Sequence, residues 1–456
     1  MSKKSLTAVN ILILAAGQGK RMGGTRPKVL HTIGRRSMLS HVVATALELG
    51  ELLDVAQIGI VHGPDQYSSF QADIAAEFPN PKQDIIFTEQ TERLGTGHAV
   101  RCGLPAFNDT LPLLVLYGDQ PLMGAAGLTE MMQTLQSHAL CIAGFKTDNP
   151  HGFGRLLKDS SGGIAAIVEE KDATEDQREI NLCNAGLMAL STEILPSIKD
   201  LEAKNAAKEF YLTDLVALAN AQNLSVQHIT FSFEEMASVN TLAQLAATEA
   251  LWQQNKRVEL LQQGVHMLAP ETVYFSVDTN IAPGCFIEPN VVFARGVSVA
   301  KDTRILAFSH LEQANIGQKC QIGPYARIRP KTVLEDDVKI GNFVEIKNSR
   351  LQSHVRANHL AYLGDSFIEQ RVNIGAGTIT CNYDGQAKYI THIGENAFIG
   401  TNSSLVAPLN IGKNSIVGAG SVISDDIEDD DLSLERNKQV IIRGGAKRHR
   451  ERKVEK

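Results

Sequence analysis

The sequence lacks several features that would restrict its class. Its 456 residues include one tryptophan and six cysteines, and the cysteines form no C-x-x-C pair. Scattered thiols of this kind favour reduced cysteines in a cytoplasmic protein and give no zinc motif. No apolar run approaches the roughly 18 residues that a membrane span needs. The net charge is −7, so a chain-wide basic field for nucleic acid is also lacking.

Charged residues at the two ends of the chain raise two questions: whether the N-terminal end is a secretion signal, and whether the basic C-terminal end is ordered. Lys3 and Lys4 precede an apolar run over residues 9–16, as in a secretion signal. The run is short, contains Asn10 and passes directly into a glycine loop, so a buried strand fits it better. The C-terminal end is basic, and we expect it to be solvated and disordered. Its cations are Arg443, Lys447, Arg448, Arg450, Arg452, Lys453 and Lys456.

The first half of the chain alternates strand-like and helix-like segments. A length of 456 residues predicts about three units at roughly 150 residues each. Apolar runs at 11–14 and 113–117 end in glycine, as expected of parallel strands buried on both faces. Segments 38–49 and 72–78 read as helices. Strands that alternate with helices predict an α/β sheet.

A long helix is expected to connect this half with the next. Residues 241–263 contain no glycine or proline and are rich in Ala, Leu, Gln and Glu. Thr241 and Gln244 have the spacing of a capping box, and Gly264 suits a C-terminal stop. We therefore predict a helical linker between two domains.

Beyond the linker, aliphatic residues recur every six positions. At 43% hydrophobic residues, six consecutive matches arise by chance about 0.6% of the time. This period is typical of a parallel β-helix, in which each six-residue segment forms one face and its aliphatic side chain points inward. The two series are Ile316, Ile322, Ile328, Leu334, Ile340, Ile346 and Ile393, Ile399, Leu405, Ile411, Val417, Ile423.

Two further features of the repeat region lead to expectations. Glycine often follows the periodic residue, as at Gly317 and Gly400, and we expect it where the chain turns a corner. Interruptions near 348–367 and 377–392 break the register. Insertions into a solenoid tend to carry its binding surface, so chemistry is expected there.

A glycine loop after the first strand is the first candidate for nucleotide binding. Residues 14–22 read Leu-Ala-Ala-Gly-Gln-Gly-Lys-Arg-Met and are followed by Pro27-Lys28. Backbone N–H groups in such a loop can approach a phosphate or a base. The loop is neither a dinucleotide fingerprint nor a P-loop. Arg21 and Lys28 could supply positive charge for a triphosphate, although either alone could be a surface cation.

Two more motifs support this interpretation. Leu94-Gly95-Thr96-Gly97 follows Gln90 and suits a contact to a base or a ribose. Tyr117-Gly118-Asp119 places a carboxylate just past a buried strand, where open α/β sheets bind ligands. An aspartate there suits Mg²⁺, and the structural alternative is a cap on the following helix.

Segments 14–31, 94–99 and 117–119, together with the sixfold half, closely resemble one bacterial family. It is that of bifunctional N-acetylglucosamine-1-phosphate uridyltransferases and glucosamine-1-phosphate N-acetyltransferases, and the resemblance covers nearly the whole chain. It implies an α/β fold with a Rossmann-like nucleotidyltransferase domain at 1–242 and a helical linker at 243–263. It further implies a left-handed parallel β-helix of hexapeptide repeats with a basic tail at 264–456, which is the acetyltransferase.

For the first domain the resemblance implies uridylyl transfer from UTP to N-acetylglucosamine 1-phosphate, with release of pyrophosphate. Arg21 and Lys28 would be catalytic, neutralising phosphates, and Asp119 and Asn240 would bind Mg²⁺. Gln120 and Ala185 depart from the family pattern. The residues expected to hold the nucleotide and sugar are Leu14, Ala15, Ala16, Gly17, Lys28, Gln90, Gly95, Thr96, Tyr117, Gly118, Asp119, Gly154, Glu169, Asn184 and Asn240.

For the second domain the resemblance implies acetyl transfer from acetyl-CoA to glucosamine 1-phosphate. Segment 358–365, Asn-His-Leu-Ala-Tyr-Leu-Gly-Asp, matches the family's catalytic segment, with His359 as the base that deprotonates the amino sugar. Glu345 could orient His359 or the substrate amine. Arg329, Lys347, Tyr362, Asn373 and Lys388 would bind the sugar phosphate. Ala376, Asn382, Tyr383, Thr401, Ala419 and Arg436 would contact acetyl-CoA, with Thr401 where many relatives have serine.

The resemblance also implies partners and a biological role. It points to UTP and acetyl-CoA as co-substrates, a homotrimer with acetyl sites shared between subunits, and no nucleic-acid partner. The product, UDP-N-acetylglucosamine, feeds peptidoglycan and lipopolysaccharide precursors. Two alternatives stay open from the residues alone. The solenoid could serve only assembly or regulation of a nucleotidyltransferase, or the whole chain could be a scaffold without activity.

Overall fold

The first unit of the structure is built around a mixed β-sheet. The computed structural model describes residues 8–107, 110–160, 162–205 and 208–454, and it divides into Met1–Gln253 and Gln254–Lys456. The sheet has the order β11-β7-β10-β6-β1-β4-β5, and β8 and β9 extend it from β10. Its strands are β1 (Val9–Leu14), β4 (Val55–His62), β5 (Asp84–Glu89), β6 (Leu113–Tyr117), β7 (Leu140–Lys146), β8 (Arg155–Lys158), β9 (Ile164–Val168), β10 (Leu182–Leu190) and β11 (Val226–Phe231).

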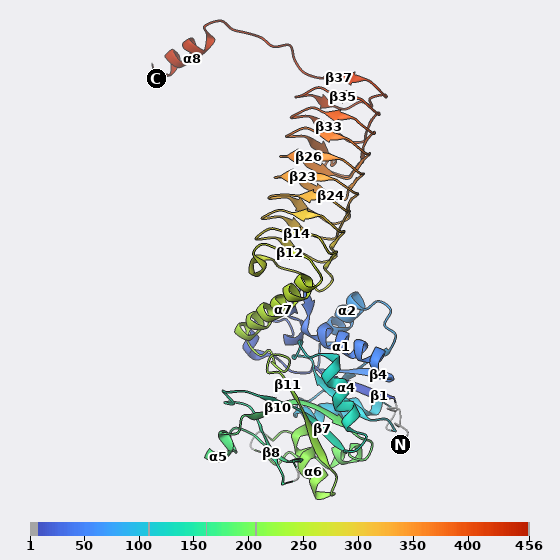
Figure 1. Cartoon of the computed structure of the whole chain (residues 1–456), viewed down its shortest axis with the longest axis vertical. Coiled ribbons are helices and arrows are strands. Elements are labelled where there is room, and N and C mark those ends of the chain that lie inside the picture. The colour runs from blue at the N-terminus through green and yellow to red at the C-terminus, as the bar shows by residue number, and fades with distance from the viewer. Residues whose placement is uncertain (1–7, 108–109, 161, 206–207, 455–456) are drawn as a thin grey trace. The chain divides into compact units, whose positions relative to one another are not determined.

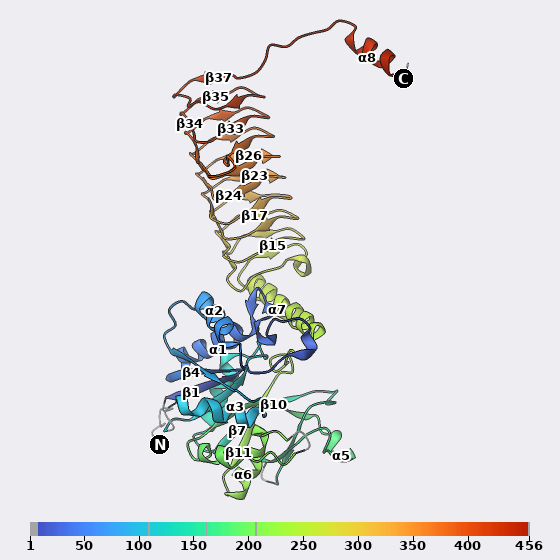
Figure 2. The ribbon, with the colours of Figure 1, turned by 180° about the vertical axis from the view of Figure 1, so that it is seen from behind.

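Helices cover both faces of this sheet (Figures 1 and 2). Alternate residues of β1 enter opposite cores, because successive side chains of a strand point to opposite faces. Ile11 and Ile13 pack with α1, α2 and α4, whereas Leu12 and Leu14 pack with α3 and α6. The helices are α1 (Met38–Leu52), α2 (Tyr67–Glu77), α3 (Thr96–Gly103), α4 (Ala125–Thr134), α5 (Glu175–Arg178) and α6 (Leu215–Ala221).

Short elements complete the unit. A hairpin of β2 (Thr32–Ile33) and β3 (Arg36–Ser37) follows the glycine loop. The 3-10 turns are η1 (Lys20–Met22), η2 (Lys28–Leu30), η3 (Leu104–Ala106), η4 (Leu195–Asp200) and η5 (Leu212–Asp214).

The buried strands predicted from the sequence are confirmed. β1 pairs in parallel with both β4 and β6, and all six residues of β1 are buried, as the strand interpretation of this run requires. Lys3 and Lys4 lie outside the described residues. The chain runs from β1 to β4 and β5 on one side and places β6 on the other, so β1 and β6 flank a topological switch point. Ligands of open α/β sheets bind at such points, beyond the carboxyl ends of the strands.

Two details of this unit go beyond the prediction or differ from it. The predicted α/β sheet is mixed, because β10 pairs antiparallel with β6, β7 and β8. The helix expected at 72–78 begins earlier, at Tyr67. Its first turn contains Ser68 and Ser69, and only Phe70 and Ile74 are buried, so the apolar periodicity that signals a helix is weak there.

The predicted linker helix is confirmed as α7 (Leu242–Gln262). The Gln244 N–H donates to Thr241 Oγ1 (3.2 Å), and the Thr241 N–H donates to Gln244 Oε1 (3.0 Å), which is a capping box. Gly264 follows the helix with φ +90°, the left-handed conformation that ends many helices. The division into compact units falls within α7, after Gln253.

The second unit is a solenoid of stacked coils (Figure 1). Among the described residues its strands form three parallel sheets, and each strand pairs with its counterpart in the next coil. The first sheet contains β12 (His266–Met267), β14 (Phe286–Ile287), β17 (Arg304–Ile305), β20 (Gln321–Ile322), β23 (Lys339–Asn342), β26 (Arg356–His359), β29 (Asn373–Ile374), β32 (Phe398–Ile399), β35 (Ile416–Val417) and β37 (Leu432–Ser433). A 3-10 turn, η6 (Pro270–Thr272), lies after β12.

The other two sheets make the remaining faces of the solenoid. One contains β13 (Asn280–Ile281), β16 (Ser298–Val299), β19 (Ala314–Ile316), β22 (Thr332–Leu334), β25 (Arg350–Leu351), β28 (Ser366–Ile368), β31 (Thr391–Ile393) and β34 (Leu409–Ile411). The other contains β15 (Val292–Phe293), β18 (His310–Leu311), β21 (Arg327–Ile328), β24 (Glu345–Lys347), β27 (Tyr362–Gly364), β30 (Ile379–Cys381), β33 (Ser404–Val406) and β36 (Val422–Ile423).

The sixfold pattern is the core of this solenoid. Every aliphatic residue of the two predicted series is buried. The prediction of an insertion at 348–367 is wrong, because the coils of the solenoid continue through these residues without a break. Ile328 pairs with Ile346, eighteen residues on, whereas Ile346 pairs with Leu363, seventeen on, so one residue fewer shifts the register. Within the second predicted interruption, β30 and the start of β31 keep their places in the sheets, and only residues 382–390 leave the coil. An isolated bridge between Tyr383 and Lys388 closes this loop.

The glycines after the periodic residues do lie at corners, but for a different reason than expected. A Cβ on Gly317 would lie 2.6 Å from the backbone carbon of Glu335 in the next coil, and one on Gly400 would lie 2.4 Å from the nitrogen of Ala419. The left-handed corner positions are taken largely by other residues, such as Asp302 (φ +61°) and Lys319 (φ +56°). At Gly317 and Gly400, close stacking of the coils and not a positive φ requires glycine, whereas Gly323, which follows Ile322, has φ +98°.

The basic C-terminal segment forms a helix, which corrects the expectation of disorder. Residues Gly445–Val454 make α8, and Lys456 lies outside the described residues. The apolar residues Val440, Ile441 and Ile442 before it are exposed. Within the described residues, no helix combines the length and the apolar character that crossing a bilayer requires.

Candidate functional site

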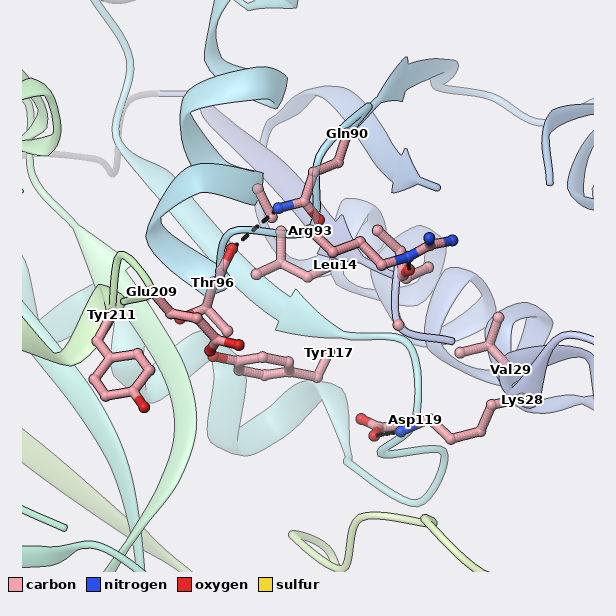
Figure 3. A pocket seen from close by; sticks show the side chains of 15 residues that line it. Leu14, Lys28, Val29, Gln90, Arg93, Thr96, Tyr117, Asp119, Glu209 and Tyr211 are labelled. Carbon is pink, nitrogen blue, oxygen red and sulfur yellow. Dashed lines mark hydrogen bonds and ion pairs between the residues drawn. The ribbon is translucent and has the colours of Figure 1, made fainter. Parts of the chain in front are cut away.

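A cavity of about 310 Å³ opens at the switch point of the first unit (Figure 3). It lies where β1 and β6 end, and the parallel register that sets Leu14 beside Tyr117 joins the glycine loop to the Tyr117–Asp119 turn. Ten of the residues predicted for nucleotide binding line it: Leu14, Ala15, Ala16, Gly17, Lys28, Gln90, Gly95, Thr96, Tyr117 and Asp119.

Lys28 forms the charged end of the cavity. Only 9% of this lysine is exposed, and lysine is rarely so buried unless it is paired. Its Nζ makes an ion pair with Asp119 (Figure 3). The same Nζ donates to Asn240 Oδ1 (3.0 Å). The two residues predicted to bind Mg²⁺, Asp119 and Asn240, therefore both contact the ammonium group of Lys28.

The donor set at this point fits Mg²⁺. No group of three His, Cys, Asp or Glu side chains within the described residues is placed to hold a metal ion. Asp119 and Asn240 offer one carboxylate and one amide oxygen. Magnesium commonly takes one or two carboxylates and completes its shell with water and substrate phosphates, so a larger protein cage is not needed.

The opposite end of the cavity is built from the Gln90–Thr96 segment. Gln90 is buried, and its Nε2 donates to Gly95 O (3.1 Å) (Figure 3). Gly95 has φ +101°, and a Cβ there would lie 2.6 Å from Phe210 O, so only glycine fits this turn. Burial raises the pKa of Tyr117 well above its usual value, which keeps the phenol neutral beside Thr96.

The predicted sugar-side residues also lie together. The Asn184 N–H donates to Gly154 O (2.8 Å), and a Cβ on Gly154 would lie 3.3 Å from Glu169 Oε1. Burial, followed by the charge of Asp172, raises the pKa of Glu169. Gly154, Glu169 and Asn184 are outside the lining of the nucleotide cavity, as is Gly118, whose N–H donates to Leu14 O (3.0 Å).

The cations at the cavity differ from the expected set. Arg21 is exposed and does not line the cavity. Arg93 lines it instead, and its Nε donates to Ala16 O (2.7 Å) in the glycine loop. The position of Arg93 between Gln90 and the Leu94–Gly97 motif is the sequence feature that could have predicted its place in the cavity. Glu209 and Tyr211, which also line the cavity, come from a segment that carries no motif.

His359 lies on the outside of the solenoid, at the end of β26. Its side chain is exposed, and it is paired in register with Asn342 of the preceding coil. The Nδ1–H donates to Asn342 Oδ1 (2.9 Å), and no group in the described part of the chain bonds to Nε2. An imidazole held in this way presents the lone pair of Nε2 outward, as a general base requires.

Asn342 and not Glu345 is the hydrogen-bond partner of His359, so the first expected role of Glu345 is not met, while a contact to the substrate amine stays a prediction. Glu345 Oε1 accepts from Arg329 Nη1 (2.7 Å) and so pairs with a predicted phosphate contact. Lys347 and Lys388 lie close enough that hydrogen bonding and repulsion by Lys388 lower the pKa of Lys347. Arg329 adds to the same effect. Cations held together in this way form a site that favours an anion.

The predicted acetyl-CoA residues occupy successive coils. The Asn402 N–H donates to Ala376 O (2.8 Å), the Gly420 N–H donates to Thr401 O (2.8 Å), and Arg436 Nη1 donates to Ala419 O (3.0 Å). Ala376, Thr401 and Ala419 therefore stack along one corner. Asn382 hydrogen-bonds the buried carboxylate of Asp365. Tyr383 is exposed in the 377–392 segment, while Tyr362 and Asn373 lie in β27 and β29.

These features define a two-domain transferase, with a nucleotidyltransferase fold followed by a hexapeptide-repeat solenoid. The MobA-like NTP transferase domain family matches residues 11–217, and the bacterial transferase hexapeptide family matches 313–348 and 390–425.

Three curated relatives match nearly the whole chain. The bifunctional protein GlmU of Azorhizobium caulinodans is 45% identical and covers 98% of this chain and 97% of its own length. The proteins of the same name from Bartonella bacilliformis and Sphingopyxis alaskensis are each 42% identical over 94% and 96% of this chain, and over 94% and 95% of their own lengths. The chain therefore belongs to the bifunctional GlmU family. It is an enzyme with a nucleotidyltransferase half and an acyltransferase half.

Proposed function

We propose that the chain makes UDP-N-acetylglucosamine in two transfers, one at each site described above. The solenoid moves an acetyl group from acetyl-CoA to glucosamine 1-phosphate. The cavity of the first unit then joins the product to UTP and releases pyrophosphate. The observation that carries the uridylyl step is the convergence of Lys28, Asp119 and Asn240 at the switch-point cavity.

In the uridylyl transfer, a phosphate oxygen of N-acetylglucosamine 1-phosphate attacks the α-phosphorus of UTP. A new P–O bond forms as the bond to pyrophosphate breaks. Both reactants are anions, so electrostatic repulsion is the main obstacle and no protein nucleophile is needed. Lys28 and Arg93 bring positive charge to the cavity, and Arg21 remains a proposed phosphate contact. The base and ribose are held by Gln90, Gly95 and Thr96.

Magnesium is the proposed metal of this site. Asp119 and Asn240 would hold it, and when bound it would neutralise phosphate charge. The sugar would lie against Gly154, Glu169 and Asn184, which share hydrogen bonds and contacts beside the β6 turn.

In the acetyl transfer, the amine of glucosamine 1-phosphate attacks the thioester carbon of acetyl-CoA. His359 Nε2 takes the proton that the nitrogen must lose, a C–N bond forms, and the C–S bond breaks to release CoA. Arg329, Lys347 and Lys388 bind the sugar phosphate, with Tyr362 and Asn373 completing that pocket. Asn382, Tyr383 and Arg436 contact the acetyl-CoA together with the corner residues Ala376, Thr401 and Ala419.

We also propose that the chain works as a homotrimer in the cytoplasm. The flat faces of a β-helix suit packing about a threefold axis. The six cysteines are unpaired, as expected where thiols stay reduced. The acetyl-site residues lie on more than one corner of the solenoid, which is consistent with sites that neighbouring subunits complete.

One assay tests both transfers in the same sample. The protein is incubated with glucosamine 1-phosphate, acetyl-CoA, UTP and Mg²⁺, and free thiol and pyrophosphate are measured separately. We expect both products. A nucleotidyltransferase with a purely structural solenoid would release no thiol in this mixture, and it would release pyrophosphate from UTP only when N-acetylglucosamine 1-phosphate is supplied. That result would contradict the acetyl assignment.

Two variants assign the activities to their sites. Asp119→Ala should abolish pyrophosphate release while thiol release stays nearly intact, because Asp119 lies in the first unit only. His359→Ala should lower thiol release by about 10²–10⁴, the usual contribution of a general base. Its uridylyl transfer, measured with N-acetylglucosamine 1-phosphate supplied directly, should be preserved. Equal loss of both activities in either variant would contradict the two-site assignment.

A further inference from the structure

Gln120 is a buried amide next to Asp119. It is 4% exposed, and it stands at the turn between β6 and the segment that leads to α4. Its Nε2 donates both of its hydrogens to backbone carbonyls, Ala185 O at 2.8 Å and Met236 O at 3.1 Å. One side chain thereby joins three segments that are distant in sequence.

The three segments are those that carry the proposed metal and sugar contacts. Ala185 follows Asn184 in β10, and Met236 begins the stretch that ends at Asn240. A second bond reinforces the junction, because the Val239 N–H donates to Asp119 O (2.9 Å). Asn240 in turn accepts from Lys28 Nζ (3.0 Å). The dipeptide Asp119–Gln120 is thus bonded to the strand of Asn184 and to the residue before Asn240.

The chemistry of Gln120 is unusual for a residue that only fills space. Its Oε1 is buried and has no hydrogen-bond partner within the described residues. An unsatisfied buried acceptor destabilises a fold, and apolar side chains of similar size would avoid that cost. The two N–H bonds are therefore the feature that distinguishes glutamine from a hydrophobic residue at this position.

We propose that Gln120 is a positioning residue, whose two hydrogen bonds hold Asp119, Asn184 and Asn240 in the arrangement that binds the metal and the sugar phosphate. This inference rests on the proposed function of the cavity. Gln120 is buried and does not line the cavity. It acts by fixing the backbone on which the contacting side chains stand, and such outer partners commonly matter for metal affinity.

Two substitutions remove the bonds in different ways. Gln120→Leu keeps the approximate volume and leaves the carbonyls of Ala185 and Met236 without a donor. Gln120→Glu keeps the shape but places a carboxylate against the same two carbonyls. Asn220→Ala is the control, because Asn220 Nδ2 makes an equivalent pair of bonds, to Ala165 O (2.8 Å) and Ile164 O (3.3 Å), between α6 and β9.

The experiment measures uridylyl transfer and ligand binding on the full chain. For both Gln120 variants, the Mg²⁺ concentration for half-maximal rate and the KM for N-acetylglucosamine 1-phosphate should rise about tenfold. The KM for UTP should change less than about twofold, since Gln90, Gly95 and Thr96 are not bonded to Gln120. Thiol release at the acetyl site should match the wild type.

Binding without turnover provides the second readout. The dissociation constant of Mn²⁺ from its complex with the protein and UDP-N-acetylglucosamine, measured by electron paramagnetic resonance, should rise about tenfold in both variants. Asn220→Ala should leave the Mn²⁺ affinity and the sugar-phosphate KM unchanged.

Each other outcome overturns the inference. Equal rises in the KM of UTP and of the sugar phosphate, or a lowered Tm with unchanged metal and sugar affinities, would assign Gln120 a merely structural role. A wild-type protein whose uridylyl transfer does not depend on Mg²⁺, or that does not catalyse it, would overturn the proposed function and this inference together.

Discussion

At the scale of residues, each site contains a lysine whose charged neighbours determine what the site can bind. In the first unit, burial and two oxygen partners hold Lys28 against Asp119 and Asn240. On the solenoid the arrangement is reversed, because Lys347 lies beside another lysine and an arginine. In the first unit, Asp119 and Asn240 could bind Mg²⁺ in place of the Lys28 ammonium group. On the solenoid, the cluster of cations around Lys347 favours binding of an anion. These two local charge patterns correspond to the two transfers.

The pH dependence of acetyl transfer follows from the second pattern. Lys388 and Arg329 lower the pKa of Lys347 below 10.5, whereas Asp365 opposes them. A lysine with a lowered pKa loses its proton earlier as the pH rises, and its attraction for the sugar phosphate weakens with it. We therefore expect kcat/KM for glucosamine 1-phosphate to fall on the alkaline side below pH 10.5, because this ratio reports groups of the free enzyme.

The variant Lys388→Ala tests this cause. Removing the neighbouring positive charge should move the alkaline limb of kcat/KM to higher pH, even though the affinity for the phosphate falls at neutral pH. Lys347→Arg should remove the limb, because arginine stays charged throughout the range. A limb that keeps its position in Lys388→Ala would contradict the coupling between the two lysines.

Residues within motifs were predictable from the sequence, and residues brought in by the fold were not. Leu14, Thr96 and Asp119 stand in recognisable segments, and all of them line the cavity. Tyr211 arrives from a segment without a motif. Asn342 partners His359 from one coil earlier, a relation that depends on the seventeen-residue coil found at that point. Local sequence does not encode contacts of that length.

At the scale of elements, the solenoid shows how one period sets a fold. The aliphatic series predicted inward positions because the periodic residue of each six-residue segment is buried in the solenoid. The glycine that follows was predicted at the corner, but its cause needed coordinates. Gly317 lies against the backbone of Glu335 in the next coil, whereas Lys319, two residues on, takes the left-handed conformation (φ +56°). A sequence reveals the period and not the spacing between coils.

A pair of substitutions at this corner separates close packing from backbone strain. Gly317→Ala should lower the free energy of unfolding of the second unit by about 1–3 kcal/mol, the usual cost of overpacking. Lys319→Gly should change it by less than about 1 kcal/mol, because relief at positive φ offsets the greater entropy of the unfolded chain. Urea denaturation of the full chain, followed by loss of thiol release, measures both. The reverse order of effects would contradict the packing explanation.

At the scale of the whole molecule, the sequence predicted two catalytic halves joined by a helix, and α7 occupies the predicted place. The capping box at Thr241 and the stop at Gly264 are local signals, which explains why the bounds of this helix were predictable within a residue or two. How copies of the chain assemble is a different matter, since it depends on surfaces that no local pattern describes. The proposed trimer therefore needs its own test.

The trimer predicts that two inactive acetyl-site variants rescue each other. In solution the mass should be three times the 49.5 kDa of the chain. If His359 of one subunit acts with Lys347 of its neighbour, each homotrimer of His359→Ala or Lys347→Ala lacks every complete site. In randomly mixed trimers about a quarter of the sites combine both native residues, by simple counting on a threefold ring. Co-expression should thus restore about a quarter of the wild-type thiol release, whereas sites contained within single subunits would regain none.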